Sequence, residues 1–231
     1  VKENGFLGLV SWDTEKESLF ITTKTDPEGI AALWFRELLR KKAGTDGIRR
    51  MEDYLEAHPV TLVFECVDME HDPHVIEYPE SRVILLDIVC NCMEYEKYSY
   101  EQMCETAERL GLEHKELACV LPDWKAFADW YGQVNGKDYT YRGQQIEGFV
   151  IEDAAGRMVK LKGAYYRFWK QMRGLAREIA EKGGIDRRHV RLDAEGEAFC
   201  SWLTALYQGE GEKPEPRDIC ELRRKFLEER R

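Results

Sequence analysis

The stretch QIEGFVIEDAAGRMVKLKGAYY, residues 145–166, decides the fold of the second half of this chain. Two short runs alternate apolar and polar residues, and the Ala-Ala-Gly between them suits a turn, so the stretch predicts a β-hairpin. Glu147, Lys160 and Lys162 are unexpected on strands that cover a core, although alternating lysines often mark a solvated edge. Because Lys160 and Lys162 lie two residues apart, both side chains are expected on one face of the second strand.

Strand and helix patterns alternate before the hairpin. Runs rich in Val, Ile, Phe and Thr predict strands over 5–12, 18–24, 60–68, 74–78 and 82–89. Apolar residues at helical spacing, with serine, proline or aspartate at the starts and glycine at two of the ends, predict helices over 30–44, 48–58, 99–111 and 121–134. These patterns predict helices packed on an antiparallel sheet.

The pattern after the hairpin is helical throughout. Three amphipathic runs follow, over 165–184, 194–208 and 217–231, and the polar segment 209–216 separates the last two. We therefore expect an α+β protein with two domains. The first, 1–172, is an antiparallel-sheet domain with packed helices, and the second, 173–231, is small and all-helical.

Composition limits the classes of function. The 231 residues carry a net charge of −10, which excludes the electrostatic footprint of a protein that coats nucleic acid non-specifically, so any such contact must be local. No apolar run approaches the ~20 residues that span a bilayer. Seven cysteines without a CxxC pair favour reduced thiols over disulfides or zinc, so we expect an intracellular protein, cytoplasmic or nuclear. The chain opens at Val1-Lys2 without methionine, which indicates that an N-terminal part is missing.

Two further patterns allow a functional or a structural interpretation. Glu70, His71, Asp72 and His74 gather charged and imidazole groups, yet they lack the helical spacing of zinc hydrolases, which disfavours a metal site. A second group is aromatic and has helical spacing, which favours core packing over a base-stacking platform: Trp124, Phe127, Trp130 and Tyr131.

Four short segments in a fixed order resemble the motifs of the covalent nucleotidyltransferases, the superfamily of polynucleotide ligases and mRNA capping enzymes. KENG at 2–5, FE at 64–65, EGFVIED at 147–153 and VKLKGAYY at 159–166 resemble motifs I, III, IV and V of RNA ligases. They are most similar to those of the phage tRNA-repair RNA ligase and of the ligase domain of fungal tRNA splicing enzymes. TTK at 22–24 resembles motif Ia. Motif IIIa should fall within 82–89, where its base-contacting residue is not assigned.

The resemblance implies a set of site residues. Lys2 would attack the α-phosphate of ATP to form lysyl-AMP, with Lys160 and Lys162 as catalytic cations. Glu147 and, with less support, Glu65 would bind Mg²⁺, with Mn²⁺ as an alternative, or contact the ribose. The full nucleotide-binding set implied is Lys2, Asn4, Gly5, Lys24, Glu65, Glu147, Lys160, Lys162 and Tyr166.

The implied activity is ATP-dependent sealing of an RNA 5′-phosphate to a 3′-hydroxyl, in RNA repair or tRNA splicing, with end-healing kinase and phosphatase activities on the same or another chain. Helices rather than a β-barrel after motif V favour an RNA ligase over a capping guanylyltransferase. Two alternatives stay open. One is a capping enzyme that uses GTP, and the other is a non-catalytic RNA-binding domain derived from a ligase.

Overall fold

The computed structural model describes residues 1–72, 74–186, 188, 190–210 and 213–230. The chain divides into a first unit of Val1, Glu3–Asp72 and Tyr78–Ala118, and a second unit of Lys2, Pro73–Glu77 and Cys119–Arg231. Each unit combines helices with strands, and every strand pair except β4–β5 is antiparallel. The expected α+β class is therefore confirmed, and the described residues form no closed barrel.

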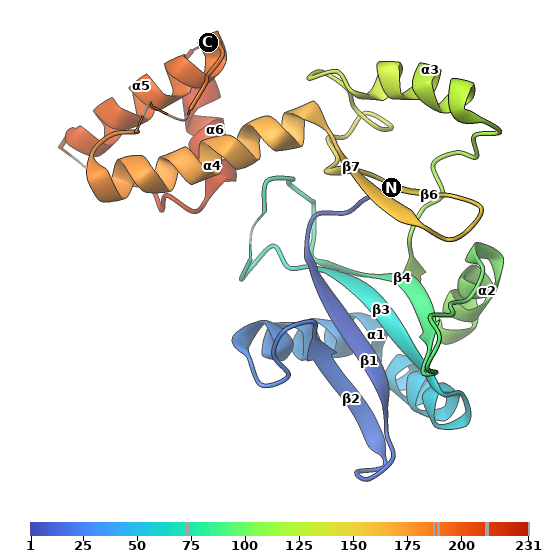
Figure 1. Ribbon diagram of the computed structural model, residues 1–231. Helices are drawn as coiled ribbons and strands as arrows, with labels where there is room; N and C mark the ends of the chain where they lie inside the picture. The colour runs from blue at the N-terminus through green and yellow to red at the C-terminus, as the bar shows by residue number, and fades with distance from the viewer. Residues whose placement is uncertain (73, 187, 189, 211–212, 231) are drawn as a thin grey trace. The chain divides into compact units, whose positions relative to one another are not determined.

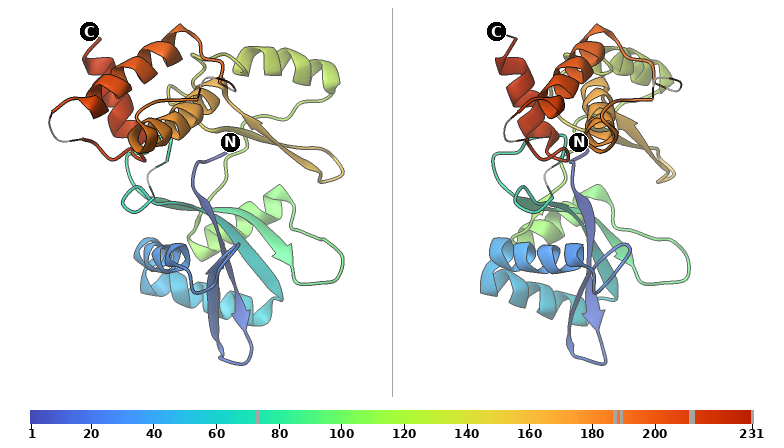
Figure 2. Two further views of the ribbon diagram at one scale, coloured as in Figure 1. Left: turned by 60° about the vertical axis from the view of Figure 1, so that its left-hand side comes forward. Right: turned by 90° about the vertical axis from the view of Figure 1, so that its left-hand side faces the viewer.

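The first unit is built on one sheet with the strand order β2-β1-β3-β4-β5 (Figure 1). Helices α1 and α2 lie on one side of this sheet, as the right-hand view of Figure 2 shows. The elements, in chain order, are β1 (Phe6–Asp13), β2 (Ser18–Thr23), α1 (Ile30–Ala57), β3 (Val60–Val67), β4 (Arg82–Cys90), α2 (Tyr100–Leu110) and β5 (Glu113–His114).

Strand β3 shows how the sheet separates its core face from its other face. Leu62 and Phe64 are fully buried and belong to one apolar cluster with Phe35 of α1. Burying one such side chain stabilises the fold by roughly 1.5–3 kcal/mol. Since side chains alternate along a strand, Glu65 points to the opposite face from its neighbour Phe64. The core thus fixes the direction of a buried carboxylate.

Local signals explain where the helices of the first unit begin and end. Ser99 caps α2 by accepting the Gln102 N–H at 3.2 Å, and the Gln102 side chain accepts the Ser99 N–H in return. Gly111 ends the helix with a φ of 72°. The two helices expected over 30–44 and 48–58 are one element, α1, with a kink at Gly44.

The second unit contains the hairpin and most of the helices. Antiparallel strands β6 and β7 pair from Gly148↔Lys162 to Glu152↔Met158, so the predicted hairpin is confirmed. Helix α4 follows β7 and packs against α5 and α6 (Figure 2). The elements are α3 (Trp124–Val134), β6 (Gly148–Glu152), β7 (Met158–Lys162), α4 (Ala164–Lys182), α5 (Ala194–Gln208) and α6 (Ile219–Glu228).

The segment 74–78 was expected to form a strand, and this prediction is wrong. Val75 and Ile76 are buried, but outside any sheet. Buried Arg223 of α6 donates to the Val75 carbonyl oxygen at 2.9 Å and to Glu77 at 2.8 Å. The guanidinium therefore satisfies a backbone acceptor that a neighbouring strand would otherwise have to satisfy.

Helix α4 runs without interruption through the domain boundary expected after residue 172. The division into domains 1–172 and 173–231 stays a prediction. None of the helices in the described part of the chain is both long and apolar enough to cross a membrane.

Candidate active site

Glu147, directly before β6, binds two lysines. Its Oε2 lies 3.2 Å from Nζ of Lys2, and its Oε1 lies 3.0 Å from Nζ of Lys162. The Glu147 side chain is 3% exposed, that of Lys2 13% and that of Lys162 33%. Because water reaches this carboxylate poorly, the two ammonium groups compensate its buried charge. Lys2, Glu147 and Lys162 are called the lysine–glutamate cluster below.

Backbone hydrogen bonds bring the three side chains of this cluster together. The Lys2 N–H donates to the Gly148 carbonyl oxygen at 2.9 Å in an isolated antiparallel bridge. Gly148 pairs with Lys162 in the hairpin, and the Gly163 N–H donates to the Glu147 carbonyl oxygen at 2.8 Å. The positions of the charged groups are therefore fixed by regular pairing as well as by their mutual attraction.

Gly148 is required by this close backbone approach. Its φ is 148°, a conformation that residues with a side chain rarely adopt. A Cβ at this position would lie 2.0 Å from the Leu161 carbonyl oxygen. Any side chain would therefore separate β6 from β7 beside the Glu147 carboxylate.

The ring of Tyr166 is contacted by two lysines. Nζ of Lys162 lies 4.8 Å from the ring centroid, and Nζ of Lys170 lies 5.7 Å from it. Burial disfavours the charge of Lys162, but its hydrogen bond and attraction to Glu147 outweigh burial and raise the pKa of Lys162. The positive charge of Lys162, followed by burial, lowers the pKa of Lys170. Lys162 is thus held firmly as a cation beside a second cation.

The electrostatics of this region suit a phosphorylated ligand. Lys2, Lys162 and Lys170 bring three ammonium groups to the surroundings of one carboxylate, which leaves positive charge for an anion. Sequence analysis predicted all of these residues except Lys170. Its position four residues after Tyr166, on the same helix face, is the signal that could have found it.

A second carboxylate, Glu65, organises the segment after Lys2 within the first unit. The Gly5 N–H donates to Glu65 Oε1 at 2.8 Å, and the Asn4 N–H donates to the Tyr78 hydroxyl at 2.7 Å. Asn4 and Glu65 are 4% and 6% exposed. Burial raises the pKa of Tyr78, so its phenol stays neutral. These four residues are called the backbone-holding cluster.

Tyr78 was not found by sequence analysis, because nothing local marks a tyrosine between two loop residues as a hydrogen-bond partner of a distant backbone. Gly5 was predicted for nucleotide contact. The structure gives this glycine a packing reason: a Cβ there would lie 2.0 Å from the Cys66 carbonyl oxygen. A role of Gly5 in binding a nucleotide stays a prediction.

Besides Tyr166, whose ring Lys162 and Lys170 contact, two predicted residues lie outside both clusters. Lys160 is exposed on β7, two residues before Lys162, and forms no ion pair with any residue that the structure describes. Lys24 is exposed directly after β2 in the first unit. Both side chains are accessible to a ligand.

The carboxylates predicted to bind metal suit a magnesium ion that takes its other ligands from phosphates and water. No group of three or more His, Cys, Asp or Glu side chains that could hold a metal ion occurs among the described residues. Mg²⁺ usually binds through one or two carboxylates together with substrate phosphates and water. Glu147 and Glu65 each offer one buried carboxylate in its own unit, and a single carboxylate suits an ion that arrives with nucleotide phosphates.

The charged segment near His71 makes contacts within the first unit. Asp68 Oδ2 lies 2.9 Å from Nδ1 of His71, and the imidazole stacks on Trp34 with ring centroids 5.1 Å apart. The hydrogen bond that the imidazole donates to the Asp68 carboxylate raises the pKa of His71. This pair therefore ties a loop to α1.

The aromatic side chains of α3 have two environments. Trp130 packs edge-on against Phe149 of β6, with centroids 4.9 Å apart, which confirms a packing role. Trp124 is 78% exposed and stacks on Phe127 with centroids 5.0 Å apart. One end of the helix covers the hairpin, and the other end is open to solvent.

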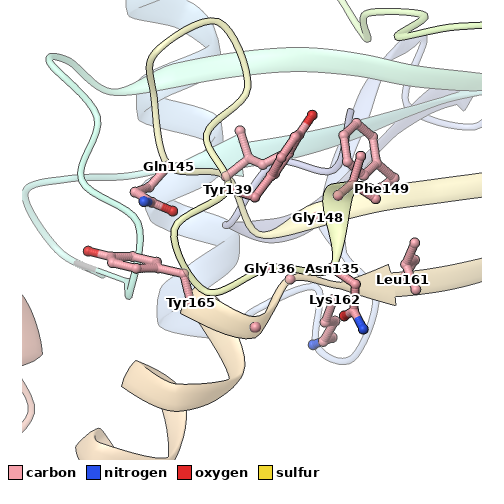
Figure 3. A pocket seen from close by; sticks show the side chains of 13 residues that line it. Asn135, Gly136, Tyr139, Gln145, Gly148, Phe149, Leu161, Lys162 and Tyr165 are labelled. Carbon is pink, nitrogen blue, oxygen red and sulfur yellow. The ribbon is translucent and has the colours of Figure 1, made fainter. Parts of the chain in front are cut away.

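A pocket lies where the hairpin meets the start of α4 (Figure 3). Its lining includes Tyr139, Gln145 and Lys162, and the Lys162 side chain points away from the Tyr139 ring (Figure 3). The enclosed volume is about 10 Å³, room for about one water molecule. A nucleotide does not fit inside it, so the accessible lysine side chains are the better candidates for nucleotide contact.

Comparison with known proteins gives one clear relationship. The family model described as RNA ligase matches residues 1–166 of this chain. This range includes both clusters and ends at Tyr166. The comparison with curated proteins gives no match.

Proposed function

The chain belongs to the RNA ligase family of nucleotidyltransferases, and we propose that it seals RNA ends with ATP through a lysyl-AMP intermediate on Lys2. The observation that carries this proposal is the position of the Lys2 amine, 3.2 Å from one oxygen of Glu147, while Lys162 lies 3.0 Å from the other. A nucleophilic amine, a group that orients it and a cation for phosphate thus lie in one cluster.

In the first step, the Lys2 ammonium gives a proton to solvent, and the lone pair of the neutral amine attacks the α-phosphorus of ATP; the nitrogen gives a second proton to solvent as the phosphoramidate forms. A phosphorus–nitrogen bond forms, the bond to the bridging oxygen breaks, and pyrophosphate leaves with the electron pair. Glu147 orients the amine. Lys162, together with the accessible Lys160, stabilises the negative charge that grows on the phosphate oxygens.

Glu147 and Glu65 are the proposed protein ligands for Mg²⁺, or Mn²⁺ in its place. When bound with the nucleotide, the ion supplies charge neutralisation on the phosphate oxygens. Asn4, Gly5, Lys24 and Tyr166 complete the proposed nucleotide-binding residues.

In the second step, a 5′-phosphate oxygen of RNA attacks the phosphorus of lysyl-AMP, which releases Lys2 and forms an RNA with AMP at its 5′ end. In the third step, a 3′-hydroxyl attacks the 5′-phosphate, loses its proton and displaces AMP. The product is a phosphodiester. The setting we propose is intracellular RNA repair or tRNA splicing, after kinase and phosphatase activities have prepared the ends.

The decisive experiment offers the protein α-labelled ATP or GTP with magnesium and then adds RNA with a 5′-phosphate and a 3′-hydroxyl. We expect label from ATP on the protein, its transfer to RNA, and a sealed product. Label from GTP alone would indicate a capping enzyme instead. RNA binding without label from either nucleotide would indicate a non-catalytic domain.

A further inference from the structure

Three cations form a stripe along one face of α4, where Lys170 and Arg177 are exposed and Arg173 is half-buried. Lys170, Arg173 and Arg177 are separated by three and four residues, so they share one face of the helix. Helix positions between them, Met172, Leu175 and Ala176, are buried against the rest of the second unit. These three residues are called the α4 cation stripe.

The Glu147 carboxylate attracts Lys170, the first member of the stripe, without forming a salt bridge with it among the described contacts. None of its three members forms an ion pair within the part of the chain that the structure describes. The nearest carboxylate along the helix, Glu178, pairs instead with Lys182 at 3.2 Å. Since the whole chain has a net charge of −10, an unpaired basic stripe is a local exception that suits an anionic partner.

The stripe is continuous with the lysine–glutamate cluster. Lys170, its first member, contacts the ring of Tyr166, and Lys162 contacts the same ring. Mutual repulsion with Lys162 is the main reason for the lowered pKa of Lys170, and Arg173 adds to it. An anion bound along this line would relieve that repulsion.

We propose that the sugar-phosphate backbone of the RNA strand with the 5′-phosphate lies along the α4 cation stripe. Lys170 and Arg177 are ~10 Å apart along the helix axis at 1.5 Å per residue. One strand carries a phosphate every ~3.4 Å of duplex axis, so the stripe reaches at least two consecutive phosphates. The length points past a single phosphate group toward a chain of phosphates. The inference rests on the proposed function, because it assigns the strand that receives AMP.

The test uses Arg173→Gln, Arg177→Gln and the double variant, and leaves Lys170 in place because it contacts Tyr166. The matched control is Lys182→Gln, which removes one charge from the same helix on a different face. Binding of a fluorescent 5′-phosphorylated single-stranded RNA is measured by anisotropy from low to moderate salt. Self-adenylation with ATP alone and transfer of AMP to RNA are timed separately.

We expect each single stripe variant to weaken RNA binding and to reduce the salt slope of log Kd by about one, and the double variant by about two. AMP transfer should show a raised KM for RNA, roughly tenfold in the double variant. Self-adenylation and the melting temperature should match those of Lys182→Gln.

Three results would overturn the assignment. One is an unchanged salt slope in the double variant, and another is an equal loss in Lys182→Gln. The third is a loss of self-adenylation as large as the loss of transfer, which would place the phosphates of ATP on the stripe. The anisotropy measurement needs no catalysis, so it can support the RNA surface even if no lysyl-AMP forms and the proposed function fails.

Discussion

The two buried carboxylates of the predicted site, Glu147 and Glu65, hold different kinds of partner. In the second unit, Glu147 binds the ammonium groups of Lys2 and Lys162. In the first unit, Glu65 accepts a backbone N–H from Gly5, while Tyr78 accepts the neighbouring N–H of Asn4. The first arrangement controls charge, and the second controls the path of the chain directly after Lys2.

This difference in partners predicts that substitutions in the two clusters have different effects. Loss of a buried ion-pair partner leaves an uncompensated charge, which is more costly than loss of one hydrogen bond to a backbone amide. The chemistry should therefore depend most on the lysine–glutamate cluster. The backbone-holding cluster should affect both folding and rate, more moderately.

Glu147→Gln should have the largest effect. The amide cannot balance two ammonium groups, so we expect the single-turnover rate of self-adenylation to fall by roughly a hundredfold or more. The melting temperature should also fall, because Lys2 stays largely buried without its counter-charge. Quench-flow with labelled ATP gives the rate, and Glu152→Gln in the same hairpin is the control. Equal rates in the two variants would remove the central role of Glu147.

Lys162→Ala should slow self-adenylation by roughly a hundredfold, about 3 kcal/mol, in line with loss of one preorganised charge. Lys162→Arg should not restore the rate fully, since a planar guanidinium does not replace a point charge. Lys160→Ala should also slow the step. This variant keeps the ion pair between Lys162 and Glu147, which Lys162→Ala removes. Single-turnover rates together with thermal melts separate the two lysines. Near-normal rates in both alanine variants would show that Lys160 and Lys162 are ordinary solvated strand residues without a catalytic role.

Tyr78→Phe tests the backbone-holding cluster. The buried Asn4 N–H loses its acceptor, so we expect a loss of roughly 1–3 kcal/mol of stability and a roughly tenfold slower self-adenylation through poorer positioning. Tyr95→Phe is the control, because that side chain is 66% exposed. Urea unfolding and adenylation rates measure the two effects. A change in stability with no change in rate would leave Tyr78 a purely structural residue.

The smallest effect concerns a pair outside both clusters, Asp68 and His71. The hydrogen bond raises the pKa of His71 in the folded protein. At pH values below the pKa of the unfolded chain, near 6.5, the protonated imidazole therefore contributes its full stabilisation to the fold. This contribution is lost as the pH rises through the folded pKa. The melting-temperature difference between the parent and His71→Gln should therefore be larger at pH 5.5 than at pH 8.5. A difference that grows with pH would show that the imidazole stabilises the fold in its neutral form.

Sequence patterns located the hairpin, because alternation and a glycine turn are local properties. They also located Glu147 and Lys162, through their place in the motif order. The resemblance implied only that Lys2 and Glu147 belong to one site; their ion pair was not predicted, since a bridge over such a long separation leaves no local signal. The strand expected at 74–78 failed because Val75 and Ile76 are buried beside Arg223 rather than in a sheet. Tyr78 was missed because its partner, the Asn4 N–H, is distant in the sequence.

The most direct test of the central claim is mass spectrometry of the protein after incubation with ATP and magnesium. The account predicts one added AMP, stable to base and labile to acid, and peptide mapping should place it on Lys2. Lys2→Ala should gain none. No adduct at any pH from 6 to 9, or an undiminished adduct in Lys2→Ala, would contradict the assignment of Lys2 as the nucleophile that Glu147 orients.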